Sequence, residues 1–335
     1  MRRPGDVLVD EPPVWLRRAR RLGSWDRLVM KHTAARWRRL AGPENAGPLI
    51  AYVFHPKFWP YLEYLDADHV VYHAYDLFER NSGWSGKLDS FQRRLIERAD
   101  LIVASSDAIA QALEGKYGRS VTVIGNGADY EAFVHAADAG APEPPDLAAI
   151  PRPRIGYVGA LSRKIDFELI AMLAQRKRRW QFVLMGEVRS LDARSRSSFA
   201  EAERQPNVHV LSSKPHEMVP HYTGSMDVNV MCYRLADDLW VEAIYPLKLH
   251  EYLAAGRPVV SADVPSVRPF AHVVAIAHDA EQWENAIETA LSSGEPGSTA
   301  SRRAIAAANS WTARVGDLES ELAALATRKG PGERR

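Results

Sequence analysis

The chain has 335 residues, enough for two ordinary domains, and its 46% apolar and 25% charged residues are typical of a globular protein. A formal net charge of +1 excludes a global attraction to nucleic acid, and the single cysteine, Cys232, excludes internal disulfides and thiolate metal clusters. The sequence contains no run of the roughly 20 apolar residues that cross a membrane and no apolar signal-peptide core. We therefore expect a cytoplasmic protein.

Residues 14–40 combine nine basic side chains and three tryptophans with one acid, Asp26. Such a segment can form an amphipathic surface for anionic lipid headgroups or for a lipid-diphosphate acceptor. The alternative is an ordinary arginine-rich surface in water. RNA binding is disfavoured, because no recognisable nucleic-acid module accompanies the segment.

Short apolar runs alternate with amphipathic stretches along the first half. We predict strands at residues 6–9, 49–54, 69–73, 101–104 and 121–124, with helices that include 88–98 and 107–116. Continuous apolar strands separated by helices indicate a parallel sheet that is covered on both faces.

Polar residues surround the predicted strand 69–73. His73 and Asp76 are the best general-base candidates, although a structural histidine and a turn-capping aspartate are the alternatives. The run Asp66-Ala67-Asp68 is formally a D-x-D, a pattern that holds a divalent metal in some enzymes that transfer sugars. Because it falls between a predicted helix and a strand, we expect it to form a turn.

A segment rich in Ala, Asp, Gly and Pro follows and predicts a linker, after which the alternation resumes. The second half has predicted strands at residues 154–158, 181–185, 208–211, 227–231, 258–261 and 272–276. The predicted organisation is a Rossmann-like domain at 1–138, a linker at 139–153, a second Rossmann-like domain at 154–302, and a helical segment at 303–328 that returns to the first domain. The motifs described below assign the acceptor side to the first domain and nucleotide-sugar binding to the second.

The segment 241–258 has the clearest chemical pattern. Pro246 suits the first position of a helix and Gly256 its far end. Lys248 and Glu251 share one helical face. The helix start and Lys248 can bind a phosphate, and the Glu251 carboxylate one turn later can accept hydrogen bonds from sugar or ribose hydroxyls. The alternative from spacing alone is a surface helix with an ordinary Lys–Glu pair.

This segment, P-L-K-L-H-E-Y-L-A-A-G-R-P-V-V-S, resembles the donor-site helix of bacterial family-4-type (GT-B) glycosyltransferases, in particular those of teichuronic acid and exopolysaccharide assembly. The likeness extends to I-G-Y-V-G-A-L-S-R-K-I-D-F-E-L-I at 155–170, P-N-V-H-V-L at 206–211, D-V-N-V-M at 227–231 and N-G-A-D-Y-E-A-F at 126–133. It implies an α/β fold of two tandem Rossmann-like, doubly wound domains facing a cleft.

Resemblance also implies the binding residues. It places Gly159 near the donor phosphates with Arg163 and Lys164 as basic candidates, for which a solvated basic turn is the alternative. It places the nucleobase near Lys214 and His216, and adds Tyr245 and Leu249 to the donor-site helix. A dinucleotide-binding turn at Gly159 is disfavoured, because no acid closes the next strand.

Two departures from the family pattern stand out. Many relatives carry a glutamate eight residues before Glu251, where this chain has Ala243. The neighbouring Glu242 is the candidate donor-binding substitute, and the alternative is that this subgroup does without the first glutamate. Relatives also begin with a further strand, so the first domain is expected to lack its usual first strand.

The predicted function is retaining, metal-independent transfer of a hexose-type sugar from a nucleoside diphosphate sugar to a hydroxyl acceptor, without a cofactor. The acceptor could be lipid-linked and the chain a peripheral protein at the inner face of the membrane. A non-catalytic sugar-nucleotide-binding or scaffold subunit and a sugar-nucleotide epimerase of the same architecture are the alternatives.

Overall fold

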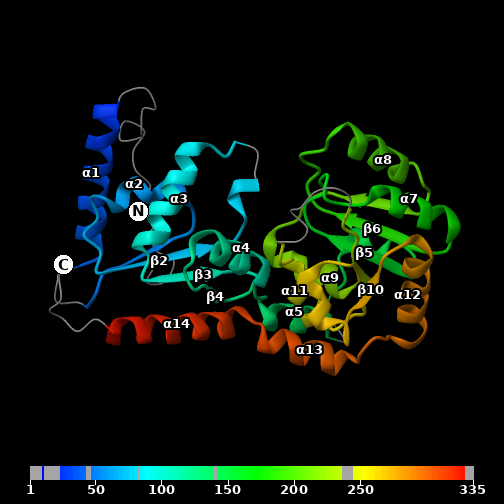
Figure 1. The fold of residues 1–335 in the computed structure, drawn as a ribbon. Helices are drawn as coiled ribbons and strands as arrows, with labels where there is room; N and C mark the ends of the chain where they lie inside the picture. The colour runs from blue at the N-terminus through cyan, green and yellow to red at the C-terminus, as the bar shows by residue number, and fades with distance from the viewer. Residues whose placement is uncertain are drawn as a thin grey trace. The chain divides into compact units, whose positions relative to one another are not determined.

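Parallel strands dominate the computed structural model, which describes residues 10, 23–42, 47–80, 83–138, 142–235 and 244–328. All pairings between its strands are parallel. The chain divides into two compact units, one comprising Met1–Ile124 with Glu319–Arg335 and the other Gly125–Leu318 (Figure 1). Two tandem α/β units of the predicted class are therefore present, while the predicted strand at 6–9 lies outside the described residues.

The first unit is built on a four-stranded sheet in the order β1-β2-β3-β4. Its strands are β1 (Ile50–Val53), β2 (His69–Ala74), β3 (Leu101–Ala104) and β4 (Thr122–Val123). Its helices are α1 (Gly23–Leu40), η3 (Pro56–Phe58), α2 (Trp59–Leu62), η4 (Phe78–Arg80), α3 (Gly86–Arg98) and α4 (Asp107–Tyr117). The central strand β2 is buried at every position except His73, which is half-buried, as expected for its continuous apolar run.

Local sequence signals set the helix ends in this unit. Ser85 and Ser106 cap α3 and α4, each accepting a hydrogen bond from the backbone N–H three residues later. Gly118 ends α4 in the left-handed conformation. These two helices are the ones that the sequence predicted at 88–98 and 107–116.

The second unit contains a six-stranded sheet in the order β10-β9-β8-β5-β6-β7. Its strands are β5 (Arg154–Val158), β6 (Gln181–Met185), β7 (Val208–Leu211), β8 (Val228–Met231), β9 (Val259–Ala262) and β10 (Ala275–Ala277). Its helices are α5 (Tyr130–Ala137), α6 (Pro145–Ala148), α7 (Phe167–Arg176), α8 (Ala193–Glu203), η5 (His216–Met218), α9 (Val219–Gly224), α11 (Lys248–Ala254), η6 (Pro265–Phe270), α12 (Ala280–Ser293) and α13 (Thr299–Ala308). The last helix, α14 (Trp311–Arg328), begins in this unit, and its residues from Glu319 onward belong to the first.

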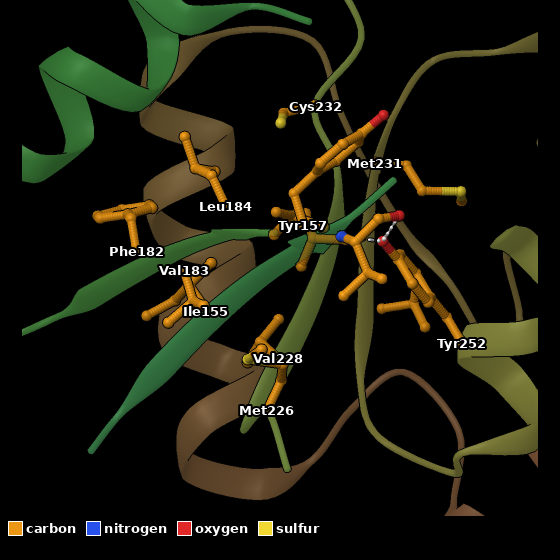
Figure 2. Packing of buried hydrophobic residues seen from close by; sticks show 14 of the residues in the cluster. Ile155, Tyr157, Phe182, Val183, Leu184, Met226, Val228, Met231, Cys232 and Tyr252 are labelled. Carbon is orange, nitrogen blue, oxygen red and sulfur yellow. Dashed lines mark hydrogen bonds between the residues drawn. The ribbon is translucent and has the colours of Figure 1, made fainter. Parts of the chain in front are cut away.

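The strands of this second sheet supply the core. Ile155, Phe182, Leu184 and Val228 are all almost completely buried (Figure 2). The hydroxyl of Tyr252 is hydrogen-bonded to the backbone N–H and carbonyl of Val158, so α11 is attached to the end of β5. The core therefore fixes the helix that carries Lys248 against the first strand of the sheet.

The structure corrects the expected linker. Leu147 of α6 and the following Ile150 are buried in the core of the second unit, and the Arg154 guanidinium is paired with Glu143. Helix α5 packs on α9 and α11, so the division of the chain falls after Ile124 rather than at residue 138. A few large apolar side chains are enough to bind this Ala-, Gly- and Pro-rich stretch to the second unit.

Candidate functional site

The strand order of the second sheet reverses beside β5. Strands β6 and β7 lie on one side of β5, whereas β8, β9 and β10 lie on the other. In open parallel sheets, ligands bind outside the carboxyl ends of the strands at such a reversal. Gly159 leaves β5 at this point and Tyr233 leaves β8, so the candidate site lies around these two residues.

Gly159 makes a turn whose backbone conformation disfavours a side chain and whose surroundings are crowded by Lys248. Its φ of 141° is in the range that favours glycine, and its N–H donates to the Met185 carbonyl over 2.9 Å. A Cβ atom at Gly159 would lie 3.3 Å from both Cε and Nζ of Lys248. A Cβ atom at the neighbouring Gly186 would lie 2.1 Å from the Gly159 oxygen. The two glycines together allow the ends of β5 and β6 to approach closely beside Lys248.

The helix that carries Lys248 begins later than predicted. Helix α11 starts at Lys248 itself, and Leu247 is its N-cap. Pro246 lies in the preceding turn, where its carbonyl accepts a hydrogen bond from Leu249 N–H over 3.1 Å, and does not occupy the first helical position. At the other end, Gly256 has a φ of 72° just beyond the helix, which confirms its predicted place.

Aromatic rings surround the half-buried Lys248 side chain. Its Nζ atom donates to the Tyr233 hydroxyl over 3.2 Å. The same nitrogen lies 4.9 Å from the ring centroid of Tyr157 and 5.6 Å from that of Tyr233. Among the residues that the structure describes, Lys248 forms no ion pair with a carboxylate.

This environment keeps Lys248 charged. Burial lowers the pKa of its ammonium group, but the phenolic oxygens of Tyr157, Tyr233 and Tyr252 and the hydrogen bond to Tyr233 more than offset that effect. The pKa therefore lies above its ordinary value, and the side chain is cationic at neutral pH.

Glu251 lies three residues after Lys248 in α11 and is half-buried. Burial raises the pKa of its carboxyl group, while the charges of Lys248 and His216 oppose that rise. Within the described part of the chain, its carboxylate accepts no hydrogen bond. The helix thus presents a cation and, one turn later, an acceptor for hydroxyl groups on the same face.

The basic turn at Arg163 and Lys164 is exposed and lies close to Tyr233. Ile165 pairs with Tyr233 in an antiparallel bridge, and Arg234 N–H donates to the Lys164 carbonyl over 2.9 Å. The backbone of the turn is therefore fixed at the ends of β5 and β8.

Lys214 and His216 follow β7. The Lys214 ammonium lies 2.6 Å from the Asp146 carboxylate of α6 and over the ring of Tyr222. Its side chain therefore holds α6 against the sheet. His216 is exposed and close enough to Glu251 to influence its pKa.

Two other predicted donor residues have structural side-chain contacts. The side chain of Leu249 is completely buried in the core, so only its backbone could reach a ligand. The Tyr245 hydroxyl lies 2.7 Å from Nε2 of the buried His250, and its carbonyl accepts from the Asn126 side chain. Glu242 and Ala243 lie outside the described residues.

In the first unit, His73 is half-buried near the end of β2. Its Nδ1 atom lies 2.6 Å from the Tyr52 hydroxyl, and its ring packs beside Phe54. Burial lowers the pKa of His73 to about 4 and raises that of Tyr52 to about 12, so both groups are neutral at pH 7. Asp76 is half-buried in the loop that follows.

The carboxylate of Asp68 accepts a hydrogen bond from Leu49 N–H over 2.8 Å, and the carbonyl of Asp66 accepts one from Arg38. These contacts favour the turn interpretation of Asp66-Ala67-Asp68. No cluster of His, Cys, Asp and Glu that could hold a metal occurs among the described residues.

The basic segment at 14–40 is described from residue 23 onward, where it forms α1. Val29, Met30, Thr33 and Ala34 are its buried face. Arg36 pairs with Asp10, and Arg38 bonds to Asp66, so these two arginines have structural partners. The described part of the chain contains no helix whose length and apolarity would let it cross a membrane.

Known proteins are similar to this chain in sequence and in fold. Residues 152–293, which include the turn at Gly159 and all of α11, match the family model of glycosyl transferases group 1. The match lies within the second unit. The chain is 35% identical over 212 residues to the teichuronic acid biosynthesis glycosyltransferase TuaH of Bacillus subtilis, a match that covers 59% of this chain and 51% of TuaH. The chain thus spans about half the length of this curated relative.

Solved structures share the fold. The HepE protein of Anabaena, solved in complex with UDP, superposes with a TM-score of 0.68 at 17% identity over 89% of this chain and 82% of HepE. The sucrose-phosphate synthase of Thermosynechococcus elongatus superposes with a TM-score of 0.64 at 17% identity over 89% of this chain and 79% of that one. These similarities confirm the predicted GT-B fold class.

Sequence reasoning missed Tyr157 and Tyr233, the two tyrosines nearest to the Lys248 ammonium. A tyrosine in an apolar strand is usually a core residue, and Tyr157 is indeed only 2% exposed, so its residue type gave no functional signal. The only available signal was position, since each lies at or just beyond the carboxyl end of a strand beside the reversal.

Proposed function

We propose that this protein is a glycosyltransferase that moves a hexose-type sugar from a nucleoside diphosphate sugar to a hydroxyl acceptor. The observation that carries the proposal is that the end of the Lys248 side chain occupies the space beside Gly159 where a Cβ atom would stand, at the reversal of the second sheet. A side-chain-free turn beside a charged ammonium is suited to a diphosphate, which needs both close backbone approach and positive charge.

The remaining donor contacts follow from the same helix. The Glu251 carboxylate is available to accept hydrogen bonds from ribose or sugar hydroxyls, and His216 lies near it. Arg163 and Lys164 are held near Tyr233 and can add positive charge. Catalysis would rest on positioning the donor and on stabilising the departing diphosphate, without a metal ion. Retention of anomeric configuration is part of the proposal through the family resemblance.

On the acceptor side, we assign His73 and Asp76 as candidate contacts of the reacting sugar. A histidine whose pKa is about 4 is a weak base at neutral pH, so hydrogen bonding to a substrate hydroxyl suits His73 better than full proton removal. Asp76, in the loop that follows, is the other candidate contact.

The similarity to TuaH supports a role in surface polysaccharide or glycoconjugate synthesis. A lipid-linked acceptor at the inner face of the membrane would suit this role, and the basic segment at 14–40 could bring the chain to anionic headgroups. Only part of that segment would be available, because Arg36 and Arg38 bond within the first unit.

The decisive experiment is a screen of purified full-length protein against UDP-, GDP-, ADP- and dTDP-sugars. Calorimetry would measure binding, and release of the nucleoside diphosphate would measure turnover with or without hydroxyl acceptors. We expect one donor to bind and to be hydrolysed or transferred, and Lys248→Ala to weaken both signals. Binding without turnover would favour a sugar-nucleotide-binding subunit, and interconversion of sugar epimers would favour an epimerase.

A further inference from the structure

Among the described residues, aromatic side chains and not a counter-ion lie beside the Lys248 ammonium. Its Nζ atom lies within 6 Å of two ring centroids and bonds to one phenolic hydroxyl, yet among the described residues no carboxylate pairs with it. Elsewhere in the same unit, Lys177 and Lys214 are each paired with acids. A partly buried lysine with neutral partners retains its whole positive charge for an anionic ligand.

The two rings are themselves fixed. Tyr157 is the fourth residue of β5 and 2% exposed, and its hydroxyl donates to the Ala160 carbonyl over 3.3 Å. Tyr233 is 5% exposed, and its backbone is bonded to Met231 and bridged to Ile165. The Tyr252 hydroxyl of α11 is hydrogen-bonded to the backbone of Val158, as dashed lines mark in Figure 2. Neither ring can move away from Lys248 without disturbing the ends of β5 and β8.

We propose that Tyr157 and Tyr233 are positioning residues that hold the Lys248 ammonium beside Gly159 for contact with the donor diphosphate. We call Tyr157, Tyr233 and Lys248 the aromatic cage. The Tyr157 ring stabilises the cation, and the ammonium donates one N–H to the Tyr233 hydroxyl, so its remaining N–H groups are available to phosphate oxygens. A carboxylate in place of either ring would neutralise the ammonium and compete with the diphosphate. This inference rests on the proposed function, since it assumes that Lys248 binds phosphate.

The test begins with the free protein. Ring currents should shift the ε-proton resonances of Lys248 upfield in protein labelled with ¹³C-lysine, with the signal assigned by its loss in Lys248→Arg. Tyr157→Leu should return the resonance toward the position of an ordinary lysine, whereas Tyr157→Phe should leave it shifted. Tyr233→Phe removes only the hydroxyl and keeps the packing, so it tests the cage even if Tyr157→Leu does not fold.

The same resonances then report anion binding. Inorganic pyrophosphate is the probe, because it carries the diphosphate charge without a base or sugar. We expect its affinity to fall about 3- to 30-fold in Tyr157→Leu and to be retained in Tyr157→Phe, as the loss of a cation–π contact predicts. Trp180→Leu, which removes a buried ring near Lys177, controls for lost core packing and should bind pyrophosphate normally.

The outcomes distinguish failure of the aromatic cage from failure of the proposed donor site. If wild-type protein binds pyrophosphate and Tyr157→Leu and Tyr233→Phe both bind it equally well, the aromatic cage is overturned while the donor site stands. An unshifted Lys248 resonance in the wild type would also overturn the cage. If pyrophosphate does not change the Lys248 resonance of the wild type, Lys248 does not bind phosphate. That result would overturn the phosphate role in the proposed function and the inference about the aromatic cage together.

Discussion

A Cβ atom at Gly159 would lie 3.3 Å from the ammonium nitrogen of Lys248, although the two residues are 89 positions apart in the sequence. The contact joins the turn after β5 to the first residue of α11. It makes the glycine and the lysine parts of one surface, at the strand ends where parallel sheets bind ligands.

Gly159→Ala should therefore impair both the backbone and the site. A φ of 141° is unfavourable for alanine, so we expect a loss of stability of about 1–3 kcal/mol, together with weaker nucleotide binding. Thermal unfolding and calorimetry would measure the two effects. Gly115→Ala in α4 is the matched control, because nothing lies within 4 Å of its added Cβ and its φ is ordinary. Unchanged affinity in Gly159→Ala would exclude close approach of a ligand to this turn.

Lys248→Ala should weaken binding of the donor and of its free nucleoside diphosphate by similar factors. Loss of a charge-assisted hydrogen bond is worth about 1.5–3 kcal/mol, or roughly 10- to 150-fold in affinity. Lys177→Ala is the control, since that lysine is paired with Glu284 and Glu288 of α12. Calorimetry on both variants decides the matter: equal nucleotide affinity in Lys248→Ala and wild type would remove Lys248 from the phosphate site.

Activity should survive chelation. The site supplies its positive charge through Lys248 and the nearby basic turn, and the Asp68 carboxylate is engaged with Leu49 N–H. We expect turnover in excess EDTA to match that in buffer with Mg²⁺ or Mn²⁺. Complete loss of activity in EDTA, followed by recovery when metal is added, would instead favour a metal role for Asp66 and Asp68.

Stability should fall as the pH decreases below about 6.5. Burial, assisted by the charge of Arg314, lowers the pKa of His250 to about 3, whereas an unfolded histidine titrates near its ordinary value of about 6.5. Below pH 6.5 the His250 imidazole is protonated in the unfolded chain but stays neutral in the folded chain. The free energy of unfolding therefore decreases by up to about 1.4 kcal/mol per pH unit until about pH 3. Above pH 6.5 this histidine contributes no pH dependence.

Urea denaturation of the wild type and His250→Gln at pH 7 and pH 5 checks this prediction. The variant should lose about 2 kcal/mol less than the wild type between the two pH values, because glutamine does not titrate. Parallel losses in the two proteins would show that folding does not lower the pKa of His250.

Liposome co-sedimentation tests the basic segment at 14–40. Binding should increase with anionic lipid content, decrease with salt, and drop when Arg17, Arg18, Arg20 and Arg21 become glutamine. Each basic side chain near an anionic surface contributes about 1 kcal/mol, which salt screens. The matched control replaces Arg36 and Arg38, whose partners lie within the first unit. Equal recovery with neutral and anionic vesicles would identify the segment as ordinary surface.

Much of the fold was predictable because it depends on local patterns. The buried strands β5 and β6 coincide with the predicted ranges. In a chain where strands alternate with helices, a short continuous apolar run bounded by polar residues forms a buried parallel strand. The linker was mispredicted for a related reason. Composition averages over a segment, whereas Leu147 and Ile150 alone bury enough apolar surface to hold it to the second unit.

Spacing within a few residues was enough to predict that Lys248 and Glu251 share a helical face and that a glycine turn follows the first strand of the second half. The packing of the second unit was needed to show that Gly159 lies beside Lys248, that two tyrosines lie beside the ammonium, and that Lys214 is paired with Asp146. Each of these pairs joins residues that lie 15 or more positions apart in the sequence. They are set by the order in which the strands pair, which brings the ends of β5 and β8 together and which no local pattern records.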